Sequence, residues 1–220
     1  MTAREAAART REPSSTRDAI LDAAERRFAE RGFAGVSVRQ ITADAGLRTQ
    51  ASLYHHYKNK RAIYEAVLAR GIAPIVAIVT GAETTGPRAV SAPTRESMEA
   101  TLDAVCDYLA EHPHLPRLIE RAGLDDSRYL KGAVTRHLRP LYELGVQTLA
   151  AGLGTRWSAA DLPHLAAGCY HLIFGYFANH ELLAMVTKDD PLSPAAIAGQ
   201  RRFMKAAVAE LLGLGSARET

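Results

Sequence analysis

Apolar residues recur at helical spacing along the first third of the chain. One face of a first predicted helix is apolar and is formed by Ile20, Leu21, Ala24 and Phe28. Charged residues fill the opposite face, as in a helix that lies against a core. The pattern begins near residues 14–16, which can cap a helix, and ends at Gly32, which tolerates a left-handed backbone. Phe33 follows directly and can pack back on Phe28.

A second helix is predicted to start at Ser37. Ser37 and Gln40 have the spacing of a capping box, in which each side chain bonds the backbone N–H of the other residue. Gly46 ends this short helix, and a turn leads to a third helix over residues 49–57. Asn59 can then cap a fourth helix. This order of helix, glycine turn and helix is typical of a helix-turn-helix, although generic two-helix hairpins share it.

The rest of the chain continues in helical periods and has no strand pattern. A long helix begins at Lys60 and is expected to bend near Gly71–Pro74, because proline removes a backbone donor. Further helices are predicted over residues 94–111, 114–123, 126–151, 158–187 and 194–213. The sequence therefore predicts an all-α protein. Its expected parts are a flexible basic arm at 1–13, a small helical domain at 14–60 and a larger one at 61–220.

Composition and charge narrow the function classes. With 47% hydrophobic and 23% charged residues, the chain can bury a core. Residues 1–60 hold eleven Lys and Arg against seven Asp and Glu, whereas the remainder is nearly neutral. A basic N-terminal quarter is a weak indication of nucleic-acid binding. Cys106 and Cys169 are far apart, which fits a reducing cytoplasm, and we expect no secretion signal.

The sequence lacks the short motifs of common enzymes, namely a phosphate-binding loop, a nucleophile elbow and a zinc-protease motif. We therefore expect no catalytic activity, no cofactor and no metal. The adjacent His55 and His56 are interpreted as polar surface rather than as metal ligands. The most apolar stretch, residues 165–186, is interrupted by polar and charged residues, so we expect a buried helix and no membrane span.

Five sequence elements, in order, resemble the tetracycline-repressor (TetR/AcrR) family of transcriptional regulators. They are Thr16-Arg-Asp-Ala-Ile-Leu-Asp-Ala-Ala24, Phe28-Ala-Glu-Arg-Gly-Phe33, Ser37-Val-Arg-Gln-Ile41, Ala45-Gly-Leu47 and Leu53-Tyr-His-His-Tyr-Lys-Asn-Lys60. The resemblance covers about residues 14–68. It implies an N-terminal three-helix, helix-turn-helix DNA-binding domain. It also implies a larger C-terminal helical domain for ligand binding and dimerisation, with about nine helices.

The resemblance also implies which residues contact DNA. In that family the third helix enters the major groove, and flanking residues bind the phosphate backbone. Tyr54 and His56 resemble the family's phosphate-contacting pair, and Lys60 resembles a lysine that contacts the backbone at the start of the next helix. Ser37 lies where a helix N-terminus can offer its hydroxyl and N–H groups to a phosphate.

The residues that contact base edges are harder to assign. Arg39 resembles a position that reaches a base edge, although it could instead pair with Asp44 or Glu25 on the surface. The segment before Leu53 is one residue longer than in most relatives, and this insertion falls at the front of the third helix. Gln50 suits adenine. The base-contacting candidates are Arg48, Thr49, Gln50 and Ser52.

The larger domain is expected to hold an effector cavity among its central helices, as the resemblance implies. Its candidate lining residues are polar positions on otherwise apolar helices, each of which could equally be an ordinary core residue. They are Cys106, Arg121, His137, Tyr142, Tyr170 and His171. The last two predicted helices are too apolar for an outer layer. The resemblance implies that they pair with a second copy as a four-helix bundle, while intrachain core must account for part of this apolar surface. Their apolar residues are Leu172, Phe174, Phe177, Leu182, Ile197, Phe203, Val208 and Leu211.

Together these features predict a dimeric, ligand-responsive transcriptional regulator. We expect a repressor that binds double-stranded DNA at a near-palindromic operator as a homodimer. An organic, largely apolar small molecule would release it by favouring a conformation that fits DNA poorly. The alternative is a sequence-insensitive architectural DNA-binding protein. Competition with random duplex separates the two, because specific binders gain roughly 4–10 kcal/mol on their own sites.

Overall fold

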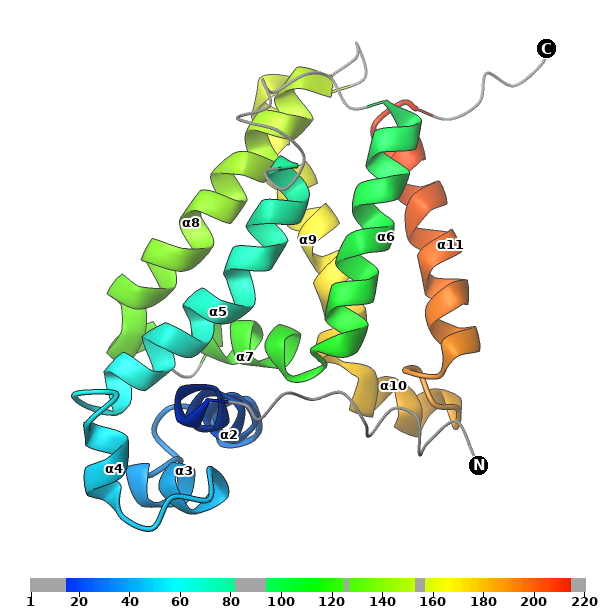
Figure 1. Cartoon of the computed structure of the whole chain (residues 1–220). Coiled ribbons are helices and arrows are strands. Elements are labelled where there is room, and N and C mark those ends of the chain that lie inside the picture. Colours follow the sequence, from blue (N-terminus) through cyan, green and yellow to red (C-terminus); the bar gives the residue numbers. More distant parts are fainter. Residues whose placement is uncertain (1–14, 82–93, 125–126, 153–156, 215–220) are drawn as a thin grey trace, which may run out of the picture. The chain divides into compact units, whose positions relative to one another are not determined.

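The computed structural model describes residues 15–81, 94–124, 127–152 and 157–214. Within those ranges it contains ten α-helices, one short 3-10 helix and no strand, which confirms the predicted all-α class. The chain divides into two compact units (Figure 1). Unit 1 comprises residues up to Val67, and unit 2 begins at Leu68.

Unit 1 consists of three short helices and the start of a fourth. They are α2 (Thr16–Arg31), α3 (Val38–Asp44), α4 (Gln50–Tyr54) and the first residues of α5 (Lys60–Thr80). α2 starts where Ser15 accepts a hydrogen bond from the Asp18 backbone N–H at 3.2 Å. It ends at Gly32, whose φ of 68° lies in the left-handed region that favours glycine. The three predicted N-terminal helices are thereby confirmed.

An aromatic group closes the core of unit 1. The Phe28 and Phe33 ring centroids lie 6.0 Å apart, which confirms the predicted packing of Phe33 back on Phe28. The Tyr64 ring from α5 packs edge-to-face with both rings, its centroid 4.9 Å from that of Phe28 and 5.5 Å from that of Phe33. Fully buried aliphatic side chains from all four helices complete the core, namely Ile20, Ile41, Leu53 and Ile63. The first four helices therefore form one packed body that fixes the placement of α3 and α4.

Unit 2 contains the remainder of α5 and six further α-helices. These are α6 (Arg95–Glu111), α7 (His114–Leu124), α8 (Ser127–Gly152), α9 (Leu162–Ala178), α10 (His180–Thr187) and α11 (Pro194–Leu211), with a 3-10 turn at Ala159–Asp161. The single helix predicted over 158–187 is wrong, because Asn179 interrupts it. The Asn179 side chain donates to the Gly175 carbonyl at 3.0 Å, next to the bond from its own backbone N–H at 3.1 Å.

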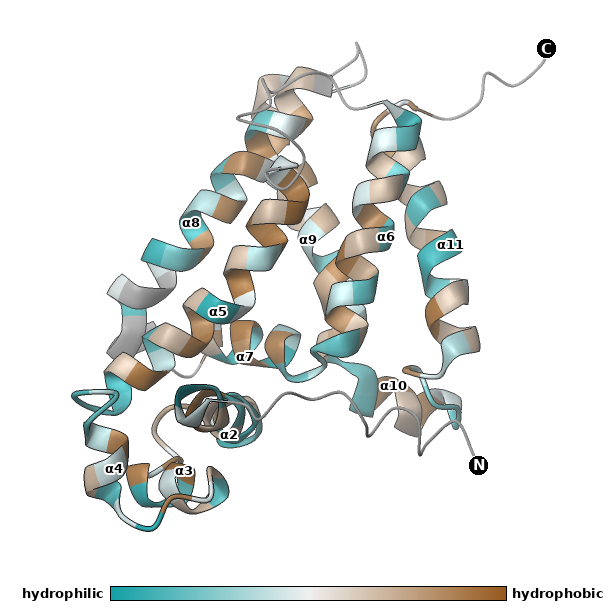
Figure 2. Ribbon diagram, in the orientation of Figure 1, coloured by the Kyte–Doolittle hydropathy of each residue, from teal (hydrophilic) through white to brown (hydrophobic). Residues whose placement is uncertain are grey.

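Two apolar clusters hold unit 2 together. Met98 and Leu102 of α6 pack on Val208 and Ala209 of α11. A second cluster joins α8 to α9 and consists of Leu149, Leu162, Leu165 and Ala166. Trp157 packs against this second cluster and donates from its indole N–H to the Leu211 carbonyl at 2.6 Å. Figure 2 shows apolar and polar residues alternating along these helices.

Helix α5 is continuous across the boundary between the units and is largely apolar (Figure 2). By length and composition alone, among the described helices only α5 could cross a membrane. Its large apolar side chains are nevertheless packed inside the protein, as in the core helix of a globular protein; they include Ile63, Val67, Leu68, Ile72 and Ile75. Gly71 lies against Leu115 of α7, and its carbonyl accepts a hydrogen bond from the Tyr108 hydroxyl at 3.0 Å.

Candidate nucleic-acid interface

The start of α3 is fixed by the predicted capping box. The Ser37 backbone N–H donates to Gln40 Oε1 at 2.8 Å, and Ser37 Oγ accepts from the Gln40 backbone N–H at 3.3 Å. The Ser37 hydroxyl also donates to Gln40 Oε1 at 2.9 Å. The first two of these hydrogen bonds satisfy backbone N–H groups that the start of a helix leaves unpaired. Ser37 remains exposed at the N-terminus of α3.

A glycine turn joins α3 to α4. Gly46 has a φ of 70°, and the Leu47 backbone N–H returns to the Thr42 carbonyl at 3.0 Å. Thr49 then caps α4: its Oγ1 accepts from the Ser52 backbone N–H at 3.3 Å and lies 3.1 Å from the Ser52 hydroxyl. Arg48 therefore lies in the turn before the cap, and Gln50 is the first residue of α4.

Helix α4 is shorter than the helix predicted over 49–57. It ends at Tyr54, and residues 55 and 56 continue as a turn. The backbone N–H groups of His56 and Tyr57 both donate to the Leu53 carbonyl, at 2.9 and 3.1 Å. Sharing one acceptor tightens the chain at this point, so that Tyr57 turns into the core with 6% exposure while Tyr54 remains 47% exposed.

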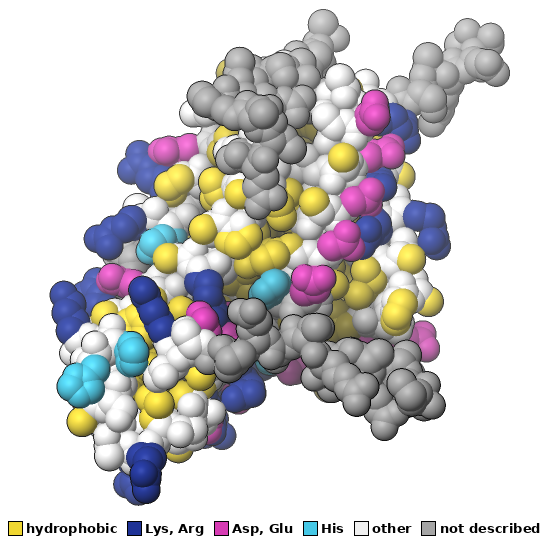
Figure 3. Space-filling model, viewed as in Figure 1, with side chains coloured by type: hydrophobic (Ala, Val, Ile, Leu, Met, Phe, Trp, Pro, Cys, Tyr) yellow, Lys and Arg dark blue, Asp and Glu magenta, His cyan; other side chains and the backbone are white. Residues whose placement is uncertain are grey.

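Most predicted DNA-contacting side chains lie on the surface of unit 1. Arg39, Arg48, Thr49, Gln50, Tyr54 and His56 are exposed, and Ser52 is half-buried. Figure 3 shows Lys, Arg and His side chains gathered over α3, α4 and the turns beside them. Among the residues that the structure describes, Arg39, Arg48 and Gln50 make no hydrogen bond or ion pair. Their assignment to base edges stays a prediction.

The alternative partners considered for Arg39 are not found. The Asp44 carboxylate is bound instead by Arg27 of α2, with distances of 2.5 Å from Nε and 2.9 Å from a terminal nitrogen. This bidentate pair holds the pKa of Asp44 below its usual range, mainly through its hydrogen bond. It also ties the end of α3 to α2, so that Arg39 projects from a helix anchored at both ends.

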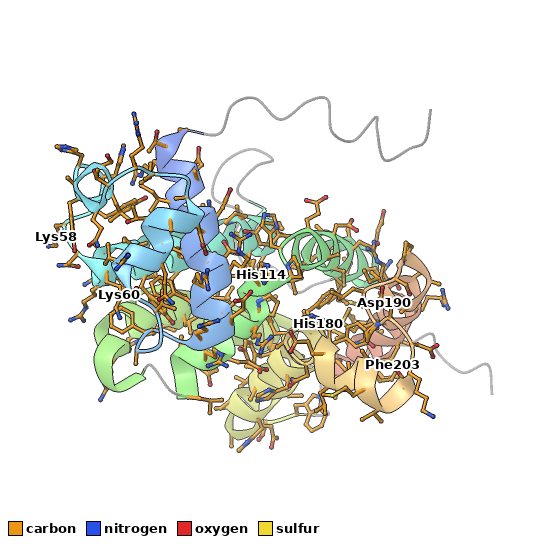
Figure 4. The ribbon with its side chains drawn as sticks, turned by 90° about the horizontal axis from the view of Figure 1, so that it is seen from below. Lys58, Lys60, His114, His180, Asp190 and Phe203 are labelled. Carbon is orange, nitrogen blue, oxygen red and sulfur yellow. The ribbon has the colours of Figure 1, made fainter. Side chains whose placement is uncertain are left out.

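The environment of Lys60 differs from the one expected of a side chain that contacts the DNA phosphate backbone. Its ammonium donates to the carbonyls of Phe33 and Val36, both at 2.8 Å, and lies 4.3 Å from the centroid of the Phe33 ring. Lys58, two residues earlier, is exposed. Figure 4 shows Lys58 at the outer edge of unit 1 and Lys60 set further in. Lys60 therefore fastens the start of α5 to the turn between α2 and α3, and its contact with phosphate stays a prediction.

The predicted effector residues are spread over four helices of unit 2. Cys106 of α6 is fully buried, and burial raises its thiol pKa to about 11. Burial also raises the pKa of Tyr170 to about 12. The Tyr170 ring stacks on that of Phe174, with centroids 4.9 Å apart, and its centroid lies 5.2 Å from that of the His171 ring.

The other effector candidates are less enclosed. Arg121 and His137 are half-buried, and each already has an interaction partner. Tyr142 and His171 are exposed. The Tyr170 and His171 rings contact each other, and the lining role of the six residues stays a prediction. In the described part of the chain, no three or more His, Cys, Asp or Glu side chains are grouped as metal ligands would be.

Sequence comparisons relate part of the chain to known transcriptional regulators. The family model for bacterial regulatory proteins of the tetR family matches residues 20–67, which include α3, α4 and their flanking turns. The chain is 30% identical over 116 residues to the HTH-type transcriptional repressor SCO4008 of Streptomyces coelicolor, covering 52% of this chain and 53% of that protein. It is 44% identical over 57 residues to the HTH-type transcriptional repressor KstR2 of Mycolicibacterium smegmatis, covering 26% and 27%.

The chain thus spans about half the length of the first of these relatives and about a quarter of the second. A solved structure extends the likeness of fold to nearly the whole chain. The fatty acid degradation regulator FadR from Bacillus halodurans matches with a TM-score of 0.64 and 15% identity, covering 96% of this chain and all of that one. Residues 20–67 thus carry the sequence signature of the tetR family of bacterial regulatory proteins.

Proposed function

We propose that the protein is a transcriptional repressor that binds a specific DNA sequence through α3 and α4. The observation that carries this proposal is the state of the α3–turn–α4 surface. Ser37 and Thr49 cap the starts of the two helices, and Ile41 and Leu53 anchor them in the core. Arg39, Arg48 and Gln50 nevertheless face solvent with no partner in the described structure. Long polar side chains on a rigid support suit hydrogen bonding to base edges in a major groove.

The proposed contacts divide by chemistry. Tyr54, His56 and the exposed N-terminus of α3 at Ser37 bind phosphates, which orients the protein without selecting a sequence. Gln50 and Arg48 at the front of α4, with Arg39 on α3, select bases. The Thr49 and Ser52 hydroxyls bond each other, and Thr49 caps α4. These bonds fix the first turn of α4, which is the part that faces the groove.

A second copy of the chain is proposed to cover an apolar face of unit 2. Large apolar side chains are exposed there on α10 and α11, namely Leu182, Met185, Val186 and Phe203, with exposures of 53, 71, 72 and 58%. Phe174, Phe177 and Val208, which were expected to contribute to the same interface, are instead buried inside the chain. Figure 4 places Phe203 close to the α10 segment. A two-fold dimer would present two copies of α4 to half-sites about 34–36 Å apart.

The effector is proposed to be a small organic molecule bound among the helices of unit 2. α7, α8 and α9 pack on one another and carry Arg121, Tyr142 and Tyr170. An apolar body with a few polar groups on facing helices suits an organic ligand. Binding would lower DNA affinity if the ligand prefers a conformation in which the two α4 helices no longer match the operator.

Selection of DNA from a randomised duplex pool by the purified full-length protein tests the proposal. The enriched duplex is then titrated by fluorescence anisotropy against random duplex competitor. We expect a near-palindromic enriched sequence, two chains per duplex and binding that random DNA does not displace. Gln50→Ala should weaken binding by about 1–3 kcal/mol at particular base pairs only. Equal displacement by random duplex would reject the regulator and support an architectural protein.

A further inference from the structure

Arg17, in the first turn of α2, is held beside the end of α4. Its Nε donates to the Tyr57 hydroxyl at 3.1 Å, and its guanidinium carbon lies 5.7 Å from the centroid of the Tyr57 ring. Tyr57 belongs to the core of unit 1 with 6% exposure, so its ring is fixed by packing. An exposed arginine is therefore restrained by a buried residue 40 positions later in the chain.

The two terminal nitrogens of the Arg17 guanidinium are available to bind a ligand. A guanidinium group carries five N–H donors in a planar fork, of which Tyr57 takes the one on Nε. The two terminal nitrogens have no hydrogen bond or ion pair among the described residues. Their shared edge matches the spacing of two oxygens of one phosphate group. Because the Nε bond and the ring contact fix the plane of the group, little side-chain entropy remains to be lost on binding.

Among the described residues, no carboxylate forms an ion pair with Arg17. The nearest carboxylate in sequence, Asp18, accepts instead from the Ser15 hydroxyl at 2.7 Å. The Tyr57 hydroxyl raises the pKa of Arg17 most, and the Asp18 charge adds a smaller effect in the same direction. A surface arginine paired with a carboxylate is the common alternative, and that pairing does not occur within the part of the chain that the structure describes.

We propose that Arg17 binds a DNA phosphate beside the one bound by Tyr54 and His56, and that Tyr57 positions it. The turn that follows α4 carries His56 and Tyr57 as neighbours, with both backbone N–H groups on the Leu53 carbonyl. Arg17 thereby brings a charge from α2 to the same end of α4 as the phosphate contacts. This inference rests on the proposed DNA-binding function, and it adds a residue from α2 to the interface.

Salt-dependent binding of full-length variants tests it, with both the enriched duplex and a random-sequence 30-base-pair duplex as probes. Arg17→Ala should lower affinity about 3- to 10-fold near 0.1 M salt on both probes, and reduce the slope of log K against log salt by about 0.9. Tyr57→Phe keeps the charge, so it should weaken binding about 2- to 3-fold with an unchanged slope. In the Arg17→Ala background, Tyr57→Phe should have no further effect.

Arg26→Ala is the matched control. Arg26 lies nine residues along α2, which is half a turn round at 100° per residue, so it projects from the opposite face. The proposal is wrong if Arg17→Ala has the same DNA affinity and salt slope as Arg26→Ala. It is also wrong if the losses of binding free energy caused by Arg17→Ala and Tyr57→Phe simply add in the double variant. If the wild type binds both probes equally, the regulator proposal fails, while the Arg17→Ala slope on random duplex still decides this inference.

Discussion

Lys60→Met isolates the two carbonyl bonds that hold the turn before α3. Methionine keeps an unbranched apolar stem of similar length and lacks the ammonium. The lost interactions are two charge-assisted bonds of 2.8 Å to Phe33 and Val36, and a cation contact at 4.3 Å from the Phe33 ring. Hydrogen bonds to charged groups contribute about 1.5–3 kcal/mol each, and an exposed cation contact about 0.5–1 kcal/mol. Because Lys60 is partly exposed, we expect unit 1 to lose about 2–4 kcal/mol.

Native-state hydrogen exchange of the full chain, followed peptide by peptide, measures this loss where it occurs. A loss of 2 kcal/mol corresponds to roughly 30-fold faster exchange of the protected amides of α2 and α3. Amides of α9 and α11 in unit 2 serve as the internal reference. The salt slope of DNA binding is measured on the same variant, because a phosphate contact by Lys60 would lower it by about 0.9.

Lys58→Met is the matched control, since it removes the same charge two residues away from an exposed side chain. We expect it to leave exchange in unit 1 unchanged. If Lys60→Met exchanges at the rate of Lys58→Met, the carbonyl bonds contribute no stability and the reasoning from their geometry is wrong. A lowered salt slope without faster exchange would assign Lys60 to phosphate binding alone.

Three further perturbations test other contacts. Gly71→Ala places a Cβ 2.4 Å from a buried Leu115 methyl carbon, so thermal unfolding should show a loss of about 1–3 kcal/mol, and a smaller one in a Leu115→Ala background. Asp44→Asn should destabilise unit 1 at pH 7, and hydrogen exchange of the amides of α2 and α3 measures the loss. Because Arg27 lowers the pKa of Asp44, that difference should shrink as pH falls from about 4 and vanish below the lowered value. With a pKa of about 11, the Cys106 thiol should resist alkylation at pH 8 in native protein and react in urea, by peptide mass spectrometry; native modification at the unfolded rate would contradict its burial.

Local sequence signals predicted much of unit 1. The capping box at Ser37 and Gln40, the left-handed Gly32 and the Asn59 cap all act over three or four residues, so residue type and spacing were sufficient. Asn59 Oδ1 indeed accepts from the Ala62 backbone N–H at 2.9 Å, as a helix cap does. The all-helical class followed from the same short-range patterns.

Contacts between distant positions could not be predicted in this way. Arg27 and Asp44 are 17 residues apart, and Lys60 lies 24 and 27 residues from the carbonyls it binds. Their pairing depends on how α2, α3 and α5 cross, which periodicity does not specify. The break at Asn179 was missed for another reason: the apolar pattern continues on both sides of it, and an asparagine inside a helix gives only a weak signal.

Trp157 gives the molecule an intrinsic optical probe. It is the chain's single tryptophan, and it lies in unit 2, where its indole N–H is bound to the Leu211 carbonyl. Fluorescence excited selectively from tryptophan therefore reports on unit 2 and not directly on the α3–α4 surface. Small molecules can be titrated against its emission without attaching a dye. A change in the same emission when DNA is added would measure how strongly the two units are coupled.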